Sequence, residues 1–402
     1  MRHRVLVIGG GFGGIKTALK LAGHRGIQVT LISDKPHFEY HAALYRVVTG
    51  RSPLEVCIPL REIFLGKDVE IIEDKLVSVD FESQLARGKS GNNYRYDSLV
   101  LALGSETAYF DIPGLEKLSY GFKSITEALE LKNHLHQLMT NLAKEPGSQV
   151  ANNCHITVVG GGASGVEVAG ELITYVHGLA HKHRVNRSKI TVDLIESAAR
   201  LLPGLSEKTS RLVEKRLRHL GVNIYLNRTL IKEEVELIYL KGMEIKTKTV
   251  IWTAGVKTNH AYQKFDEFEF DDKGRVVVDE HLHASGRENV YVIGDAAATK
   301  FSGMAQTAVN DGDLVAENIV SQIRNRPLLT YRPRPPLYAI PIGPGWAVAT
   351  VFGTQISGRL GWLVRRAADL QFFTTILPFK KAWLVFLKGR TISENCPICA
   401  GR

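Results

Sequence analysis

The chain has 402 residues, 44% hydrophobic and 23% charged, a composition that fits an ordinary folded protein of two or three domains and excludes a disordered one. Its four cysteines are too few for a disulfide framework, so we place the chain in a reducing cytoplasm. The formal net charge is +10, but eight Lys and Arg residues follow Gly358 against only Asp369 and Glu394. A nucleic-acid-binding domain would spread its basic residues over a whole face, so nucleic acid is not an expected partner.

The first stretch with a recognisable pattern is 4–14, RVLVIGGGFGG, in which an apolar strand runs directly into glycines. The strand begins so close to Met1 that no room is left for a signal peptide. The spacing is the G-x-G-x-x-G fingerprint, which holds a dinucleotide pyrophosphate on the free N–H groups at a helix N-terminus. The candidate contacts are Gly9, Gly11, Phe12, Gly13 and Gly14.

A helix over 15–23 and a second strand over 27–32 are expected next. In FAD-binding versions of this unit an acidic residue often ends that strand and holds the adenosine ribose. Ser33 occupies the usual place here, so Asp34 is the candidate, with Lys35 beside it. The alternative is that Asp34 is an ordinary turn residue at a strand end.

Residues 36–61 are predicted to form a loop and a short helix that lie along a flavin. Flavin disulfide reductases carry a redox cysteine pair in this region, but 37–50 contain no cysteine. Cys57 and Cys154 are single and lie among apolar residues, so we interpret both as small core side chains. Thiol chemistry is therefore not expected.

A buried strand over 96–104 would close the first domain, with Gly104 allowing the chain to pass the cofactor. A largely helical connector over 115–142 then leads to a second fingerprint. Ile156–Val159 precede the candidate contacts Gly160, Gly162, Ala163 and Ser164, and the last glycine, Gly165, lies 165 − 14 = 151 residues after Gly14. Two strand–fingerprint–helix units in one chain indicate two dinucleotides.

Glu196 ends the second strand of this second unit, 191–196. A carboxylate there accepts hydrogen bonds from the ribose hydroxyls and repels a 2′-phosphate, which favours NADH over NADPH. Arg200 is close by in the sequence and weakens this preference, because a basic side chain can bind the 2′-phosphate of NADPH. A later apolar strand, 249–256, ends in Ala254 and Gly255 and would close over the nicotinamide.

The stretch 289–297 is predicted to return the chain to the first domain, where Gly294 and Asp295 would face the sugar chain of the flavin cofactor. The alternative is a common Gly-Asp turn. The expected fold is thus α/β, with two Rossmann-like domains and the NADH domain inserted in the FAD domain. The predicted boundaries are 1–115 and 286–330 for FAD, 116–285 for NADH, and 331–402 for a C-terminal strand and amphipathic-helix region.

The longest uncharged run, 335–358, holds four prolines and four glycines, which favours a strand hairpin over a membrane-spanning helix. After it, apolar residues recur at helical spacing among basic ones: Leu360, Leu363, Val364, Trp383, Leu384 and Leu387. Two interpretations stay open. The segment is either a helix packed on the domain or a dimer contact, or it is an interfacial helix with basic residues at lipid phosphates.

Cys396 and Cys399 form a C-x-x-C pair near the C-terminus. A zinc or iron–sulfur site needs four ligands, and only His281 and His283 could in principle supply the others. We therefore expect no metal.

With these motifs in place, the chain resembles the type II NADH dehydrogenases, monotopic, non-pumping NADH:quinone oxidoreductases that carry FAD. The resemblance covers about Arg4 to Lys388, and its most telling stretches are VVGGGASGVEVAGEL (158–172), VIWTAGV (250–256) and AQTA (305–308). It implies FAD and NADH as cofactors, quinone as acceptor, and peripheral association with the cytoplasmic face of the cell membrane. A homodimer is left open.

The resemblance also implies site residues. Glu167 would lie beside the nicotinamide and the flavin, with Glu171 one turn further along the helix. The quinone motif of the family has two glutamines four residues apart; here the first is Gln306, flanked by Ala305 and Thr307, and the second is replaced by Asn310. Catalytic roles are therefore expected for Glu167, Gln306 and Asn310.

Two other functions are weighed against this one. The first is a soluble NAD(P)H reductase that feeds a small electron-carrier protein, docked through the basic surface. The second is a flavoprotein similar to apoptosis-inducing factor, with a signalling or binding role. A sulfide:quinone oxidoreductase is disfavoured because the cysteine pair is absent.

Overall fold

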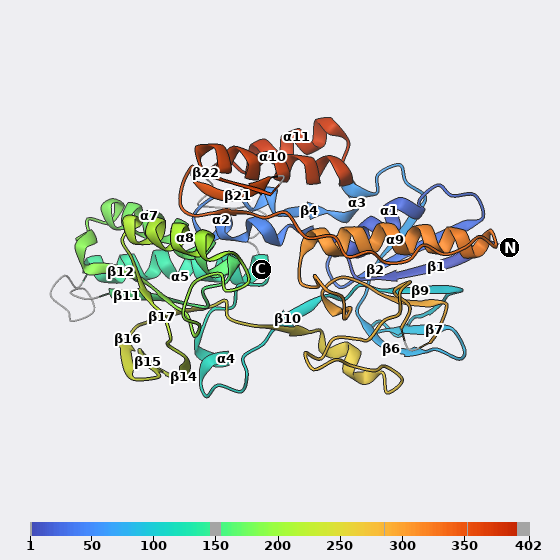
Figure 1. Cartoon of the computed structure of the whole chain (residues 1–402), viewed down its shortest axis with the longest axis horizontal. Helices are drawn as coiled ribbons and strands as arrows, with labels where there is room; N and C mark the ends of the chain where they lie inside the picture. The colour runs from blue at the N-terminus through green and yellow to red at the C-terminus, as the bar shows by residue number, and fades with distance from the viewer. Residues whose placement is uncertain (1, 145–153, 285, 352, 392–402) are drawn as a thin grey trace.

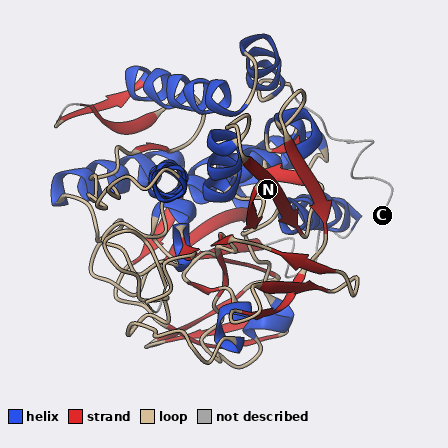
Figure 2. Cartoon of the chain, turned by 90° about the vertical axis from the view of Figure 1, so that its right-hand side faces the viewer, coloured by secondary structure: helices blue, strands red, loops and turns tan. Residues whose placement is uncertain are grey.

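The computed structural model describes residues 2–144, 154–284, 286–351 and 353–391. Two parallel sheets lie in the left and right halves of Figure 1, and the C-terminal helices lie at the top, above the middle of the molecule. Figure 2 shows the same chain from the side, with helices on both sides of the strands.

The first sheet has the strand order β19-β9-β1-β2-β5, and all its pairs are parallel. Its strands are β1 (His3–Ile8), β2 (Ile27–Ser33), β5 (Val69–Glu73), β9 (Ser98–Leu101) and β19 (Val290–Val292). The central strands are near-continuous apolar runs, as expected for a sheet covered on both faces. Helices α1 (Phe12–Leu21) and α9 (Ala305–Ile323) pack against each other on one side.

The second sheet has the order β13-β12-β11-β17, again all parallel. Its strands are β11 (Cys154–Val159), β12 (Ile190–Ile195), β13 (Val222–Tyr225) and β17 (Thr249–Trp252). Helices α5 (Ile125–Lys144), α7 (Ala163–Lys182) and α8 (Glu207–Leu220) accompany it. Because β19 rejoins the first sheet after this unit is complete, the second unit is inserted in the first. The antiparallel pair β10 (Ser105–Thr107) and β18 (Val256–Thr258) connects them.

Short elements fill the connections. The strands are β3 (His37–Glu39) with β4 (Cys57–Pro59), β6 (Leu76–Asp80), β7 (Leu85–Gly88), β8 (Asn93–Arg95), β14 (Leu230–Glu234), β15 (Leu237–Leu240) and β16 (Met243–Lys246). The short helices are α2 (Leu44–Val48), α3 (Leu60–Ile63), α4 (Leu115–Leu118), η1 (His41–Ala43), η2 (Pro53–Glu55), η3 (Arg187–Lys189), η4 (His260–Lys264) and η5 (Gly294–Ala296).

The C-terminal region is an antiparallel sheet followed by two helices. Its elements are β20 (Ala339–Pro341), β21 (Ala347–Val351), β22 (Thr354–Gly358), α10 (Arg359–Ile376) and α11 (Phe379–Lys388). No helix within the described ranges is long and apolar enough to cross a membrane. The strand hairpin predicted over 335–358 is confirmed.

One apolar core joins all three parts. It runs from Val7 of the first sheet through Leu172 of α7 to Phe373 and Ile376 of α10, each at most 5% exposed. The C-terminal region is therefore part of the folded body, since its helices share buried surface with both sheets. The predicted α/β class and the two Rossmann-like units are confirmed. The first helix begins at Phe12, earlier than the predicted 15, because Gly11 is its N-cap.

Candidate active site

The first glycine turn joins β1 to α1. Gly9 has φ +118°, and a Cβ on Gly14 would overlap the Gly9 carbonyl oxygen, so both positions require glycine. Gly11 caps α1 without a side-chain hydrogen bond, and a Cβ there would meet nothing within 4 Å. The first turn of α1 thus has no side-chain cap and no acidic residue, and the space beside Gly11 is open, an arrangement that suits a pyrophosphate.

The other two residues of this turn pack inward. The Phe12 ring meets the Phe38 ring edge-on with centroids 4.9 Å apart. Gly13 faces Ile293 and the Ala308 carbonyl, so a side chain there would separate α1 from α9. The turn is therefore held rigidly on the first sheet.

The second turn, between β11 and α7, repeats this construction. Gly160 has φ +114°, and a Cβ on Gly165 would overlap the Gly160 carbonyl oxygen. Gly162 is the N-cap residue of α7, makes no side-chain hydrogen bond, and has open space beside it. Ala163 and Ser164, in the first turn of the helix, are exposed. The chain therefore has two uncapped helix N-termini of the same design, one in each unit.

The strand ends beside the two turns differ. Glu196 accepts hydrogen bonds from the Gly161 N–H at 2.6 Å and from the Ala198 N–H at 2.7 Å. In the first unit the residue that faces the turn is buried Ser33, whose side chain lies against Gly10, while Asp34 is exposed.

Two predicted basic residues near these strand ends are engaged within the protein. Lys35 pairs with Glu39, with Nζ 2.9 Å from Oε1. Arg200 donates to the Leu205 carbonyl and to Ser210 Oγ, each at 2.8 Å, and to the Pro203 carbonyl. The guanidinium of Arg200 is thus bound by its own loop, which weakens the argument for a 2′-phosphate partner.

Two glycines end neighbouring strands of the first sheet: Gly104 follows β9, and Gly294 follows β19. Beside them, Asp295 Oδ2 accepts from Ser105 Oγ at 2.5 Å and lies 3.5 Å from Lys123 Nζ. Ligands of parallel sheets bind at the carboxyl ends of the strands, which is where these residues lie.

In the second unit, Ala254 and Gly255 follow β17. The Ala254 backbone lies so close to Gly160 that a Cβ on Gly160 would approach it to 2.8 Å. Gly255 lies against the ring of Phe110, an exposed residue with φ +51°. The predicted nicotinamide-side residues are thus adjacent to the second glycine turn.

The N-terminus of α9 also lacks a side-chain cap. Ala305, Gln306 and Thr307 form its first turn, and Met304 caps it without a side-chain bond. Gln306 is exposed, and its Oε1 accepts from the Leu337 N–H at 3.0 Å. Asn310 lies one turn further along the helix.

A buried carboxyl that sequence analysis missed lies beside Asn310. Asp311 is 0% exposed and accepts from the Gly294 N–H at 3.0 Å through Oδ2, while its Oδ1 has no partner. Burial raises the pKa of Asp311 to about 7. This unpaired oxygen beside Gly294 and Asp295 fits a site where a further polar group binds.

Glu167 lies one turn into α7, and its side chain is 13% exposed. Its Oε1 is 3.6 Å from Arg365 Nη1 of α10. Burial raises the pKa of Glu167 to about 7, against the opposing effects of Arg365 and Arg46. Burial also raises the pKa of Glu171. Glu167 can therefore hold or release a proton near neutral pH.

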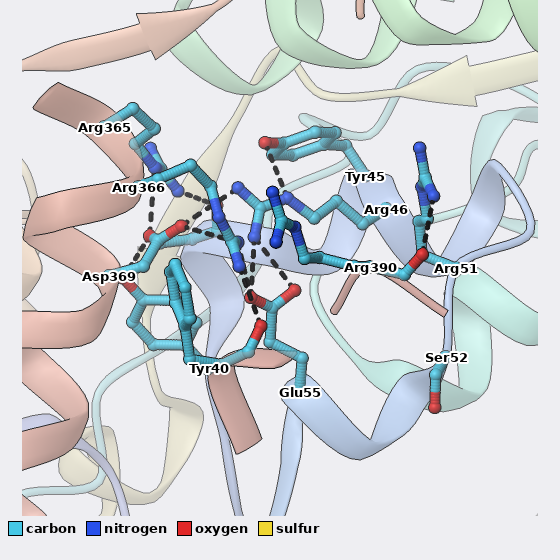
Figure 3. Close-up of polar contacts among 12 residues, drawn as sticks. Tyr40, Tyr45, Arg46, Arg51, Ser52, Glu55, Arg365, Arg366, Asp369 and Arg390 are labelled. Atoms are coloured by element: carbon cyan, nitrogen blue, oxygen red, sulfur yellow. Dashed lines mark hydrogen bonds and ion pairs between the residues drawn. The ribbon is translucent and has the colours of Figure 1, made fainter. Parts of the chain in front are cut away.

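A buried ion cluster adjoins Glu167 (Figure 3). Its members come from α2, η2 and α10 and are Arg46, Glu55, Arg365, Arg366 and Asp369, with Tyr40 beside them. Sequence analysis left open whether the basic residues of this segment pack on the domain or meet lipid phosphates; Arg365 and Arg366 pack on the domain, since they are 8% and 6% exposed. Helical spacing shows which residues share a face, but not that this face is buried against distant carboxylates.

The described residues include no group of three or more His, Cys, Asp or Glu that could hold a metal ion. Cys396 and Cys399 lie outside the described residues. Cys154 is buried, and burial raises the pKa of its thiol to about 11, which makes it a poor nucleophile. The two glycine turns, the open helix N-termini and the unpaired Asp311 oxygen together fit FAD in the first unit and NADH in the second.

Comparison with known proteins agrees with this geometry. The chain is 29% identical to the type II NADH:quinone oxidoreductase Ndh of Mycobacterium tuberculosis, covering 98% of this chain and 91% of that protein. It is 26% identical to the type II NADH:quinone oxidoreductase of Staphylococcus aureus, covering 97% and 99%. The structure of NDH2 from Plasmodium falciparum in complex with NADH superposes with a TM-score of 0.87 at 18% identity, covering 97% of this chain and 98% of that one, which shows the shared fold.

The profile of the pyridine nucleotide-disulphide oxidoreductases matches residues 3–312, which include both glycine turns and the start of α9. The chain belongs to the pyridine nucleotide-disulphide oxidoreductase family.

Proposed function

We propose that this protein is an FAD-dependent NADH:quinone oxidoreductase that does not pump protons. The observation that carries the proposal is the pair of uncapped, glycine-built helix N-termini, α1 and α7, in a chain similar over nearly its whole length to type II NADH:quinone oxidoreductases. When bound, FAD supplies the redox chemistry: it accepts hydride from NADH and passes two electrons to a quinone.

The first unit is the FAD site in this proposal. The N-terminus of α1 binds the pyrophosphate through Gly11 and the glycines around it. Gly104, Gly294 and Asp295 contact the rest of the cofactor at the carboxyl ends of β9 and β19. The N-terminus of α9, with Ala305, Gln306 and Thr307, adds free N–H groups that stabilise negative charge.

The second unit is the NADH site. The N-terminus of α7 binds the pyrophosphate, and Glu196 selects the ribose with free hydroxyls. Because Glu196 carries a charge and Arg200 is bound by its own loop, we propose NADH as the donor in preference to NADPH. Ala254 and Gly255 would flank the nicotinamide.

Glu167 moves protons in this proposal. Reduction of a quinone to a quinol needs two electrons and two protons. The hydride of NADH supplies both electrons and one proton, and a buried carboxyl with a pKa of about 7 can deliver the second proton at neutral pH. Gln306 and Asn310 would orient the quinone by amide hydrogen bonds, since both lie on α9 within one turn.

We also propose that the protein binds the cytoplasmic face of the membrane through α10 and α11. Five large apolar side chains of these helices are exposed: Leu360, Leu363, Phe379, Trp383 and Leu384. Lys380 and Lys388 are exposed among them and suit anionic headgroups. This patch favours a lipid surface over docking of a soluble carrier protein. A dimer contact through the same patch is the alternative.

The test is steady-state oxidation of NADH and NADPH by the FAD-loaded protein, with a short-chain ubiquinone and a menaquinone analogue as acceptors. We expect turnover with quinone and a preference for NADH. Gln306→Ala should raise KM for quinone, whereas Gln322→Ala, at the far end of α9, should not. If NADH reduces the flavin but no quinone reoxidises it, the acceptor proposal fails and a protein acceptor must be sought.

A further inference from the structure

The ion cluster connects three segments that are far apart in the sequence. Arg46 donates to both oxygens of Glu55, each at 2.9 Å, and through Nη2 to Asp369 Oδ2 at 2.9 Å. Arg366 donates to the same two carboxylates, at 2.6 Å to Glu55 and 3.2 Å to Asp369. Figure 3 shows the arginines of α2 and α10 pointing toward one another around these carboxylates.

Arg46 reaches Glu167 through one intermediate carboxylate. Asp369 accepts from Arg46 on Oδ2 and from Arg365 Nε on Oδ1, the latter at 3.1 Å. Arg365 in turn lies 3.6 Å from Glu167. Arg365 is also held by the Ala42 and Ala339 carbonyls, so its guanidinium has a fixed orientation. Asp369 is thus a bridge between Arg46 and the guanidinium that faces Glu167.

The charges in this cluster do not cancel. Three guanidiniums, those of Arg46, Arg365 and Arg366, meet two carboxylates that accept their hydrogen bonds, and all five side chains are at most 9% exposed. Buried charges are costly unless they are paired. Glu167, 3.6 Å from Arg365, faces this surplus positive charge and balances it when it is ionised.

We propose that Arg46 is a positioning residue for Glu167. Through Asp369 it orients Arg365, and its positive charge gives the cluster the excess positive charge that ionised Glu167 balances. This inference rests on the proposed function, in which Glu167 moves a proton. It assigns a role in proton transfer to a residue of the loop and short helix near the N-terminus.

Charged and titratable groups face Glu167 from several directions. Tyr45 and Arg46 come from α2, Arg365 and Asp369 from α10, and Glu171 from α7 itself. Strand β20, also packed against α7, has no titratable side chain. Helix α5 meets α7 two turns further on, where His136 contacts Tyr175, 3.0 Å apart. The cations that oppose the rise in the pKa of Glu167 are therefore Arg365 and Arg46.

Charge substitutions inside the cluster test the proposal because their signs differ. Arg46→Gln removes the positive excess, so the protonation midpoint of Glu167 should rise by about one pH unit. Glu55→Gln adds to the excess, so the midpoint should fall by about as much. The double variant Arg46→Gln/Glu55→Gln restores the balance and should return the midpoint toward that of the wild type. Arg218→Gln, which breaks an exposed pair with Glu214, is the matched control.

Two readouts follow the midpoint in the FAD-loaded protein. The first is the pH profile of NADH oxidation by quinone. The second, which needs no turnover, is the infrared absorption of a buried protonated carboxyl, assigned to Glu167 by its loss in Glu167→Gln. Shifts of opposite sign with recovery in the double variant support the proposal.

Shifts of the same sign in the two single variants, or a double variant displaced further than either, would show that the cluster acts only through the packing, and would overturn the proposal. If Arg46→Gln does not fold, Glu55→Gln alone still decides by the direction of its shift. If the wild type oxidises no NADH with quinone while the infrared midpoints move as expected, the proposed function fails and the electrostatic role of Arg46 stands.

Discussion

Asp369 holds the C-terminal helices on the rest of the protein, and Asp369→Asn should therefore destabilise the whole fold. Its carboxylate is 0% exposed and accepts from the Tyr40 hydroxyl at 2.8 Å as well as from three arginines. Burial opposes its ionisation, but Arg365, Arg46 and Arg366 outweigh that effect and lower the pKa of Asp369. An amide of the same shape would leave these guanidiniums buried without the charge that balances them.

Removing one partner of a buried ion pair costs about 3–5 kcal/mol. With an unfolding entropy of about 2.1 cal/mol/K per residue, a chain of 402 residues should lose about 4–6 °C in Tm. The control is Asp313→Asn on α9, whose carboxylate is 35% exposed and lies 3.4 Å from Lys16. A surface pair contributes at most about 1 kcal/mol, so this control should lose about 1 °C or less.

The measurement is thermal unfolding by calorimetry, with limited trypsin digestion at 25 °C as a local readout. In Asp369→Asn we expect faster cleavage within 359–390, because α10 and α11 would separate from α2 and η2 more often. If Asp369→Asn and Asp313→Asn lose the same Tm and are cleaved at the same rate, the cluster contributes no net stability and the reasoning is refuted.

Three further predictions concern the proposed sites. The raised pKa of Glu167 means that the folded state binds its proton more tightly than the unfolded state, so this group contributes about 3 kcal/mol of stability below pH 4.5 that is lost as the pH rises toward 7. Glu167→Gln should flatten that part of the profile of unfolding free energy against pH, and an unchanged slope would contradict the assignment. The double variant Trp383→Ser/Leu384→Ser should weaken sedimentation with anionic vesicles by about tenfold or more, because each buried side chain is worth about 2 kcal/mol; Val235→Ser, an exposed apolar residue away from α10 and α11, should leave it unchanged. Glu196→Ser should raise kcat/KM for NADPH relative to NADH by about tenfold, because the charge that repels a 2′-phosphate is gone; an unaltered ratio would show that another residue sets the preference.

The sequence by itself determined the two dinucleotide-binding units. An apolar strand followed by glycines at fixed spacing is a local pattern, and its physical requirements, a positive φ at Gly9 and Gly160 and close packing at Gly14 and Gly165, involve neighbours within a few residues. The insertion of the second unit in the first followed as well, because the second pattern is complete before the 289–297 stretch begins. The roles assigned to individual site residues stay predictions.

Only the tertiary structure decided which charged residues meet. The ion cluster joins separate segments: Arg46 and Glu55 lie near the N-terminus, and Asp369 follows Glu55 by 369 − 55 = 314 residues. Nothing in the local sequence patterns pairs them. The same is true of Asp311, which meets Gly294. For the basic residues of the C-terminal helices, packing on the domain and contact with lipid both stayed open, since a basic amphipathic stretch predicts only that charged residues share a face. Whether that face meets water, lipid or buried carboxylates depends on contacts between distant segments, and these form only when the chain has folded.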